Sequence, residues 1–194
     1  MIILGLTGSI AMGKSTTAAM FRDAGVPVWD ADAAVHRAYG HGGAAVEPVA
    51  ALVPEARAPA GLDREALRRA IAADPTLLTQ IERIVHPIVG ADRKAFLEDA
   101  RESGAPVVVL DIPILFETGG DAHVDRIVVV TCDPEEQRRR ALARDGMTPE
   151  RFDAILARQM PDVEKRARAD HILDTGLGMQ AARDQVAAIL ESLP

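Results

Sequence analysis

The sequence predicts an α/β fold in which a parallel β-sheet is flanked by helices. Short apolar runs alternate with segments of helical periodicity, which is typical of parallel strands joined by helical crossovers. The runs 107–110 and 127–130 are apolar at every position, as expected of strands buried on both faces. The third observation is size, because 194 residues with 48% hydrophobic side chains can bury a sizeable core. The expected strands are 2–6, 26–29, 106–110, 126–131 and 171–173.

Helices are expected between the strands, and several begin at residues that cap helices. Asp74 precedes a helical pattern, and Asp133 begins another in which Glu136 completes a capping box. The pair His86-Pro87 is expected to break the helix that follows Asp74, because a proline disfavours helical backbone in the residue before it. The expected helices are 15–24, 33–39, 64–73, 76–85, 88–102, two within 135–161, and 179–193.

The spacing of the strands predicts two insertions into the core. The long interval between the second and third strands holds helical patterns and no strand, so residues 33–104 are interpreted as a helical insertion. A second helical segment, 135–166, follows the fourth strand and is interpreted as a lid. Residues 1–32, 105–134 and 167–194 then form the core.

The charge distribution disfavours a general nucleic-acid binder. The net charge is −7, whereas such proteins usually carry a basic surface. Residues 135–168 are the exception, with nine basic and seven acidic side chains. These residues either bind an anion or form an exposed helix surface with internal ion pairs. The charge count alone does not decide between the two interpretations. No apolar run reaches bilayer length, and the lone Cys132 can form no internal disulfide, so we expect a cytoplasmic protein without a membrane partner.

Residues 8–16, GSIAMGKST, carry the most specific local pattern in the chain. Two glycines separated by four residues and followed by Lys-Ser form a phosphate-binding P-loop pattern, placed here between an expected strand and an expected helix. Glycines let successive N–H groups point at phosphate oxygens, and the helix N-terminus adds partial positive charge. We expect Lys14 to reach the β- and γ-phosphates and Ser15 to place its hydroxyl on Mg²⁺.

Two strand ends with aspartates and an arginine-rich helix are expected to accompany this loop. The second strand runs into Asp30 and Asp32. A carboxylate there can accept a proton from an attacking hydroxyl or help to hold Mg²⁺, or Asp32 alone can cap the next helix. The third strand ends in Asp111, which resembles a Walker-B aspartate or serves a turn. Arg140 and Arg144 share a helix face and suit the charge of a transferring phosphoryl group.

A kinase that acts on a small molecule is the function these residues favour. A nucleoside monophosphate kinase is the alternative, but its phosphate acceptor calls for arginines near the second strand, where this chain has Asp30 and Asp32. A regulatory GTPase is disfavoured because TCDP, at 131–134, stands where a guanine-reading segment is expected. A lid that grips nucleic acid is disfavoured by the net charge and by an aromatic content of 3%.

Taken as a whole, the sequence resembles the dephospho-CoA kinase family over nearly its full length. The pattern DIPILFE at 111–117, the aspartate pair and the lid arginines are more specific than the P-loop, which many families share. The matching stretches are 5–8 and 13–16, 30–32, 62–64, 86–87, 111–117, Gln137 with Arg140 and Arg144, Gln159, and 169–170.

The resemblance implies a P-loop kinase core, a helical CoA-binding domain at 33–104 and a lid, with ATP and Mg²⁺ as reactants. It implies transfer of the γ-phosphate to the ribose 3′-hydroxyl of dephospho-CoA, the last step of coenzyme A synthesis. The partner is then a small molecule, and the oligomeric state stays open. By this likeness the catalytic residues are Asp32 (the base), Lys14, Arg140 and Arg144; the nucleotide-binding residues are Gly8, Ala11, Met12, Gly13, Lys14, Ser15 and Thr16; the substrate-binding residues are Asp30, Asp32, His86 and Asp111; and the Mg²⁺ ligands are Ser15 and Asp111.

One position leaves an alternative open, and three loop positions depart from the family pattern. His86 either belongs to the acceptor site or caps a kink before Pro87. The family commonly has glycine where this chain has Ser9 and Ala11, and serine where it has Met12. Ala11 is expected to need positive φ, at a cost of ~1 kcal/mol for its β-carbon.

Overall fold

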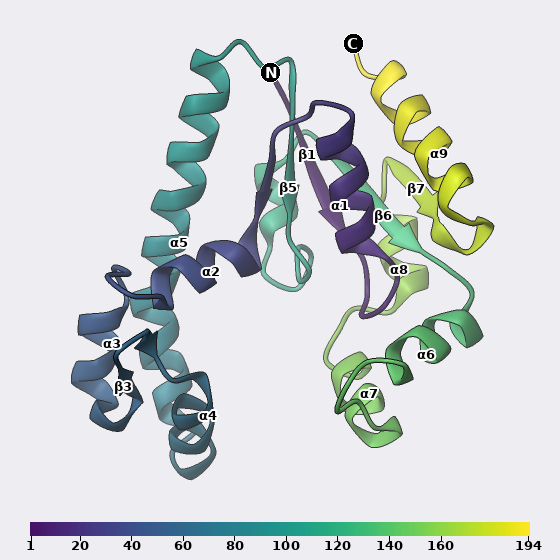
Figure 1. Ribbon diagram of the computed structural model, residues 1–194. Helices are drawn as coiled ribbons and strands as arrows, with labels where there is room; N and C mark the ends of the chain where they lie inside the picture. Colours follow the sequence, from purple (N-terminus) through teal and green to yellow (C-terminus); the bar gives the residue numbers. More distant parts are fainter. The chain divides into compact units, whose positions relative to one another are not determined.

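The computed structural model describes residues 1–194, which form two compact units. The first unit contains Met1–Trp29 and Ala100–Pro194, and the second contains Asp30–Asp99. Figure 1 follows the chain through both units. None of its helices combines the length and the hydropathy that a membrane span requires.

A five-stranded sheet forms the centre of the first unit and confirms the predicted α/β fold. Its strand order is β2-β5-β1-β6-β7, and β1 is parallel to both of its neighbours, as β7 is to β6. The five predicted strands are all present, each within two residues of its expected ends. They are β1 (Ile2–Thr7), β2 (Val28–Asp30), β5 (Val107–Asp111), β6 (Arg126–Thr131) and β7 (His171–Asp174).

Helices of the first unit cover the sheet and extend past the ends of its strands. Helix α1 (Lys14–Asp23) lies beside α9 (Met179–Glu191), and both pack on a core of buried residues that includes Leu4, Phe21 and Val186. Figure 1 shows α6 (Pro134–Leu142) and α7 (Pro149–Leu156) beyond the carboxyl ends of β1 and β6. The remaining elements are α8 (Asp162–Ala167) and the short 3₁₀ helices η2 (Gly120–His123) and η3 (Thr175–Leu177).

Two expectations for residues 135–161 are wrong. The second helix ends at Leu156, and Pro161 instead forms the N-cap of α8, a third helix that the sequence did not indicate. The capping box also fails to form. The Asp133 carboxylate accepts the N–H of Glu135, but the Glu136 side chain turns to arginines on its own helix because these offer stronger, charge-assisted hydrogen bonds.

The second unit has its own hydrophobic core, formed mainly by alanine, valine, leucine and isoleucine. The Asp63 carboxylate caps α4 by accepting the N–H groups of Glu65 and Ala66. A short antiparallel hairpin, which the sequence did not indicate, precedes this helix. The elements are α2 (Ala31–Tyr39), α3 (Val46–Leu52), η1 (Pro54–Ala56), β3 (Arg57–Ala58), β4 (Gly61–Leu62), α4 (Arg64–Ala73) and α5 (Thr76–Glu102).

Helix α5 contradicts the predicted break at Pro87. It continues without interruption from Thr76 to Glu102, with Pro87 in its interior. The apolar residues Ile81, Val85 and Ile88 recur at helical spacing on both sides of the proline, and all pack in the core of the second unit. Burial of this stripe offsets the lost hydrogen bond and the steric strain at the proline, which cost about 3 kcal/mol.

Candidate active site

The loop between β1 and α1 has a conformation that requires its two motif glycines. A β-carbon on Gly8 would lie 2.6 Å from the carbonyl oxygen of Val130, which excludes any other residue. Gly13 has φ +98° and is the N-cap of α1, where no side chain caps the helix. The N–H groups of the first turn are therefore available to an anion, which the helix dipole also favours. They belong to Lys14, Ser15 and Thr16.

Ala11 and Met12, which depart most from a glycine-rich loop, are held by packing. Ala11 has φ +62° and is the one non-glycine residue in the left-handed region, as expected. Its methyl group packs with Ala141 of α6 and Phe152 of α7. Met12 is buried in the main core, and its Sδ accepts the N–H of Cys132 at 3.2 Å. The N–H of Met12 donates to a carbonyl within the loop and is not free for phosphate.

Two glutamines hold the preceding loop residue, Ile10. The N–H of Ile10 donates to Oε1 of Gln159 at 2.9 Å, and its carbonyl oxygen accepts Nε2 of Gln137 at 2.8 Å. Gln137 lies on α6, and Gln159 follows α7. Both backbone polar groups of this loop residue are thus satisfied by the segment 135–161, so that segment and the phosphate loop are tied together.

The loop lysine forms an ion pair with the aspartate that ends β5. The Nζ of Lys14 lies 2.5 Å from Oδ1 of Asp111, whose side chain is 1% exposed. The pairing of β1 with β5 sets this contact, because Leu6 is the register partner of Asp111 and the loop begins one residue after β1 ends. The structure therefore brings together two residues that the sequence singled out separately.

A cavity of about 390 Å³ opens between the phosphate loop, α6 and the segment after β7. One part of its wall is cationic, formed by Arg139 and Arg140 of α6 and by Arg144, which lies beyond the end of that helix and not on a shared helix face as expected. Another part is apolar and is formed by two methionines and an alanine. Such a wall suits a ligand with an anionic end and an apolar ring system. The lining residues are Ala11, Gly13, Thr16, Thr17, Met20, Glu136, Arg139, Arg140, Arg144, Thr175, Gly178, Met179 and Ala182.

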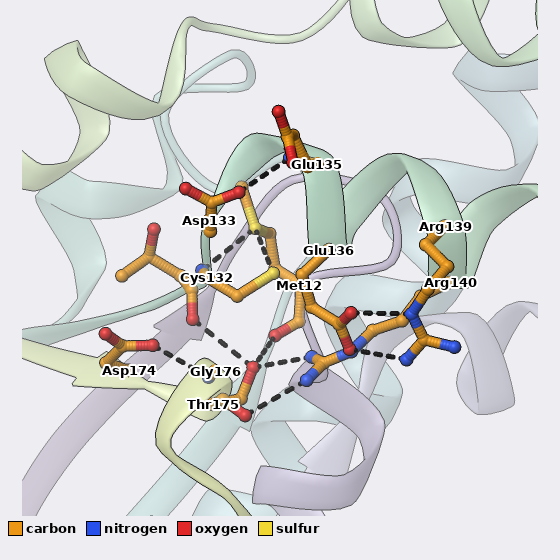
Figure 2. A network of polar contacts seen from close by, with 11 residues as sticks. Met12, Cys132, Asp133, Glu135, Glu136, Arg139, Arg140, Asp174, Thr175 and Gly176 are labelled. Atoms are coloured by element: carbon orange, nitrogen blue, oxygen red, sulfur yellow. Dashed lines mark hydrogen bonds and ion pairs between the residues drawn. The ribbon is translucent and has the colours of Figure 1, made fainter.

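The arginines on the cavity wall differ in their partners. Arg139 and Arg140 both bind the carboxylate of Glu136, at 2.7 Å in each case (Figure 2). These hydrogen bonds, first from Arg139 and then from Arg140, lower the pKa of Glu136 to about 2. Arg140 also reaches Thr175, a residue that the sequence reasoning did not single out. By contrast, the Arg144 guanidinium has neither an ion pair nor a hydrogen bond within the protein, so its charge is available to a ligand.

A buried ion pair that the sequence reasoning missed ties α8 to the segment after β5. The Nζ of Lys165, a side chain that is 0% exposed, lies 2.9 Å from Oε1 of Glu117. Burial alone raises the pKa of Glu117, but hydrogen bonds from Lys165 and from the Met160 N–H outweigh it and hold that pKa below its usual range. One lysine in an arginine-rich segment carries no local pattern that indicates such burial.

The remaining site candidates, Asp30, Asp32 and His86, lie in the second unit. The Oδ1 of Asp30 accepts the N–H of Ala33 at 2.9 Å, so Asp30 is the N-cap of α2. The expectation that Asp32 caps this helix is wrong, because the helix begins at Ala31, and Asp32 is an exposed residue of its first turn. His86 is exposed on α5 and caps no kink, since the helix does not break there.

An anion-binding loop between a buried strand and a helix, with an aspartate at the neighbouring strand end and arginines facing the same cavity, defines a P-loop kinase. The family model described as dephospho-CoA kinase matches residues 2–180. The chain belongs to the dephospho-CoA kinase family.

Curated relatives agree with this assignment, and solved structures share the fold. The dephospho-CoA kinase of Cereibacter sphaeroides is 60% identical, over 96% of this chain and 93% of the relative. That of Rhodopseudomonas palustris is 54% identical, over 99% and 96%. A crystal structure of a protein from Thermus thermophilus has a TM-score of 0.84 at 39% identity, over 100% of this chain and 98% of the other. The dephospho-CoA kinase structure from Campylobacter jejuni, at 20% identity and a TM-score of 0.72, shares the fold.

Proposed function

We propose that the protein transfers the γ-phosphate of ATP to the ribose 3′-hydroxyl of dephospho-CoA, giving coenzyme A and ADP. The observation that carries the proposal is the cavity that joins the phosphate loop to unpaired Arg144, in a chain that matches the dephospho-CoA kinase family from residue 2 to residue 180. The reaction is expected in the cytoplasm, which stays a prediction from the sequence.

The donor side of the reaction is assigned to the first unit. The N–H groups of Lys14, Ser15 and Thr16 hold the phosphates, and the Lys14 ammonium shifts from Asp111 to the β- and γ-phosphates when the nucleotide enters. The lid arginines add positive charge on the cavity wall, where it stabilises the equatorial oxygens of the transferring phosphoryl group. Positioning and cations supply most of the catalysis in this class of reaction.

The residues available to Mg²⁺ fit an ion that is held chiefly by phosphate. The hydroxyl of Ser15 and the carboxylate of Asp111 are hard oxygen ligands, which Mg²⁺ prefers. No group of three or more histidine, cysteine, aspartate or glutamate side chains could enclose a metal ion. This sparse set is typical of Mg²⁺, which keeps several waters and binds substrate phosphates. When bound, the ion neutralises charge on the β- and γ-phosphates.

The acceptor side of the reaction is assigned to the second unit. We assign the 33–104 segment to binding of dephospho-CoA, with Asp30 and His86 among its contacts. The carboxylate of Asp32 accepts the proton of the 3′-hydroxyl as the new O–P bond forms and the bond between the γ-phosphorus and the leaving oxygen of ADP breaks. Its exposed place in the first turn of α2 leaves the carboxylate accessible to a substrate hydroxyl.

A coupled assay for ADP release tests the proposal. The protein is offered ATP and Mg²⁺ with dephospho-CoA, with AMP, or with no acceptor. We expect turnover with dephospho-CoA and at most background rates in the other two reactions. Turnover with AMP alone would favour a nucleoside monophosphate kinase and refute the proposal, as would failure of dephospho-CoA to accept phosphate.

A further inference from the structure

Thr175, the first residue after β7, links the phosphate loop to an arginine of the lid (Figure 2). Its hydroxyl donates to the carbonyl oxygen of Met12 at 2.7 Å and accepts from Nη1 of Arg140 at 2.8 Å. Its carbonyl oxygen accepts Nη2 of Arg140 at 3.0 Å. One residue therefore fixes a loop peptide and both terminal nitrogens of a guanidinium.

The contact at Met12 sets the direction of the next loop amide. In a trans peptide the carbonyl and the N–H lie in one plane and point in opposite directions. Because Thr175 holds the Met12 carbonyl, the Gly13 N–H is directed away from Thr175. The neighbouring residue Ala11 is held in the left-handed region, so this peptide lies in a stretch whose conformation depends on outside contacts.

The same contacts use three of the five N–H groups of Arg140 and fix the orientation of its guanidinium. Its Nε binds Glu136 at 2.7 Å, and its Nη1 and Nη2 bind Thr175, so each nitrogen already donates a hydrogen bond. Arg144 lines the same cavity, and its guanidinium has no partner in the protein. The two arginines that the sequence grouped together are therefore not equivalent.

We propose that Thr175 is a positioning residue for phosphoryl transfer, which acts by fixing the Met12 peptide and by orienting Arg140. Arg140 then braces the phosphate loop, and Arg144 is the lid arginine that contacts the transferring phosphoryl group. The inference rests on the proposed function and states which contacts fix the conformation of the ATP-binding site.

Replacement of the threonine hydroxyl tests the first part. Thr175→Val keeps the shape but removes both hydroxyl hydrogen bonds, so we expect kcat/KM for ATP to fall about tenfold while KM for dephospho-CoA is unchanged. Thr175→Ser keeps the hydroxyl and should restore most of the loss. Thr76→Val is the matched control, because it also removes a hydroxyl hydrogen bond, at 2.7 Å to Asp74, but lies in the second unit. Equal kcat/KM for Thr175→Val and Thr76→Val would overturn the inference.

Lysine substitutions separate the two arginines. Arg140→Lys keeps the charge but cannot hold two atoms of Thr175 at once, so it should lose as much activity as Arg140→Ala. Arg144→Lys should lose clearly less activity than Arg144→Ala, because a lysine ammonium can still place a positive charge near the transferring phosphoryl group. In a double-mutant cycle, Arg140→Ala with Thr175→Val should lose less than the product of the two single losses, because both variants remove the contact between Arg140 and Thr175. Losses that multiply, or an Arg140→Lys variant as active as wild type, would contradict the brace.

Binding of a non-hydrolysable ATP analogue, measured by calorimetry, keeps this test apart from that of the proposed function. Thr175→Val should weaken binding of the analogue severalfold, whichever acceptor the enzyme phosphorylates. A wild-type chain that binds the analogue but does not phosphorylate dephospho-CoA would refute the proposed function, and the binding comparison would still decide the role of Thr175. Unchanged analogue binding in a folded Thr175→Val variant would overturn that role.

Discussion

At the scale of single residues, Ala11 shows how a phosphate loop can work without one of its glycines. The β-carbon of a residue at φ +62° costs ~1 kcal/mol, and the sequence allowed this cost to be anticipated. The compensation could not be anticipated, because it comes from Ala141 and Phe152, far along the chain. Burial of a methyl group contributes about 0.8 kcal/mol, which nearly offsets the strain.

Two substitutions at Ala11 test this balance. Ala11→Gly removes the strain, but it also removes the buried methyl group and raises the conformational entropy of the unfolded chain. Because these effects oppose one another, the free energy of unfolding should change by less than about 1 kcal/mol. Ala11→Val should lower it by about 2 kcal/mol or more, because a β-branched side chain overfills the site and tolerates positive φ poorly. Urea denaturation measures both. A valine variant as stable as wild type would show that the loop is not tightly packed.

At the scale of elements, the sequence predicted those helices, strands and loops whose structure depends on residues nearby in the chain. The strand, the loop and α1 follow from one pattern of apolar residues, glycines and Lys-Ser, and they lie where expected. The unbroken helix α5 was missed because burial of residues around Pro87 in the core outweighs the local preference. The contacts of Gln137 and Gln159 with Ile10 span 127 and 149 residues, so no local pattern specifies them.

The two glutamines that hold Ile10 should respond differently to glutamate. Gln159 uses only its oxygen as an acceptor, so Gln159→Glu should change the free energy of unfolding by less than about 0.5 kcal/mol. Gln137 uses its amide nitrogen as a donor to the Ile10 carbonyl and is 4% exposed, so Gln137→Glu should cost about 2 kcal/mol. Each variant is the control for the other in urea denaturation. Equal losses would mean that the lid does not hold the loop through these bonds.

At the scale of the whole molecule, the proposed reaction needs both units of the chain. The sequence predicted the parallel sheet and the family, because short apolar strands alternating with helices and motifs in a fixed order specify them. The role of Thr175 was not accessible, since a threonine after a strand has many uses and only the fold brings it to Met12. The proposed base, Asp32, belongs to the unit that contains residues 30–99, whereas the phosphate loop belongs to the other unit.

The central claim is that a carboxylate of the second unit activates an alcohol for attack on a nucleotide held by the first. Asp32→Asn removes the base but leaves the phosphate loop intact. Asp74→Asn, in the same unit, is the control for loss of one charge.

Single-turnover phosphoryl transfer from ATP to dephospho-CoA by Asp32→Asn, with calorimetry of an ATP analogue beside it, is the most direct measurement. The account predicts a rate lower by about 10²- to 10⁴-fold with analogue affinity unchanged. A rate within a fewfold of wild type would contradict it.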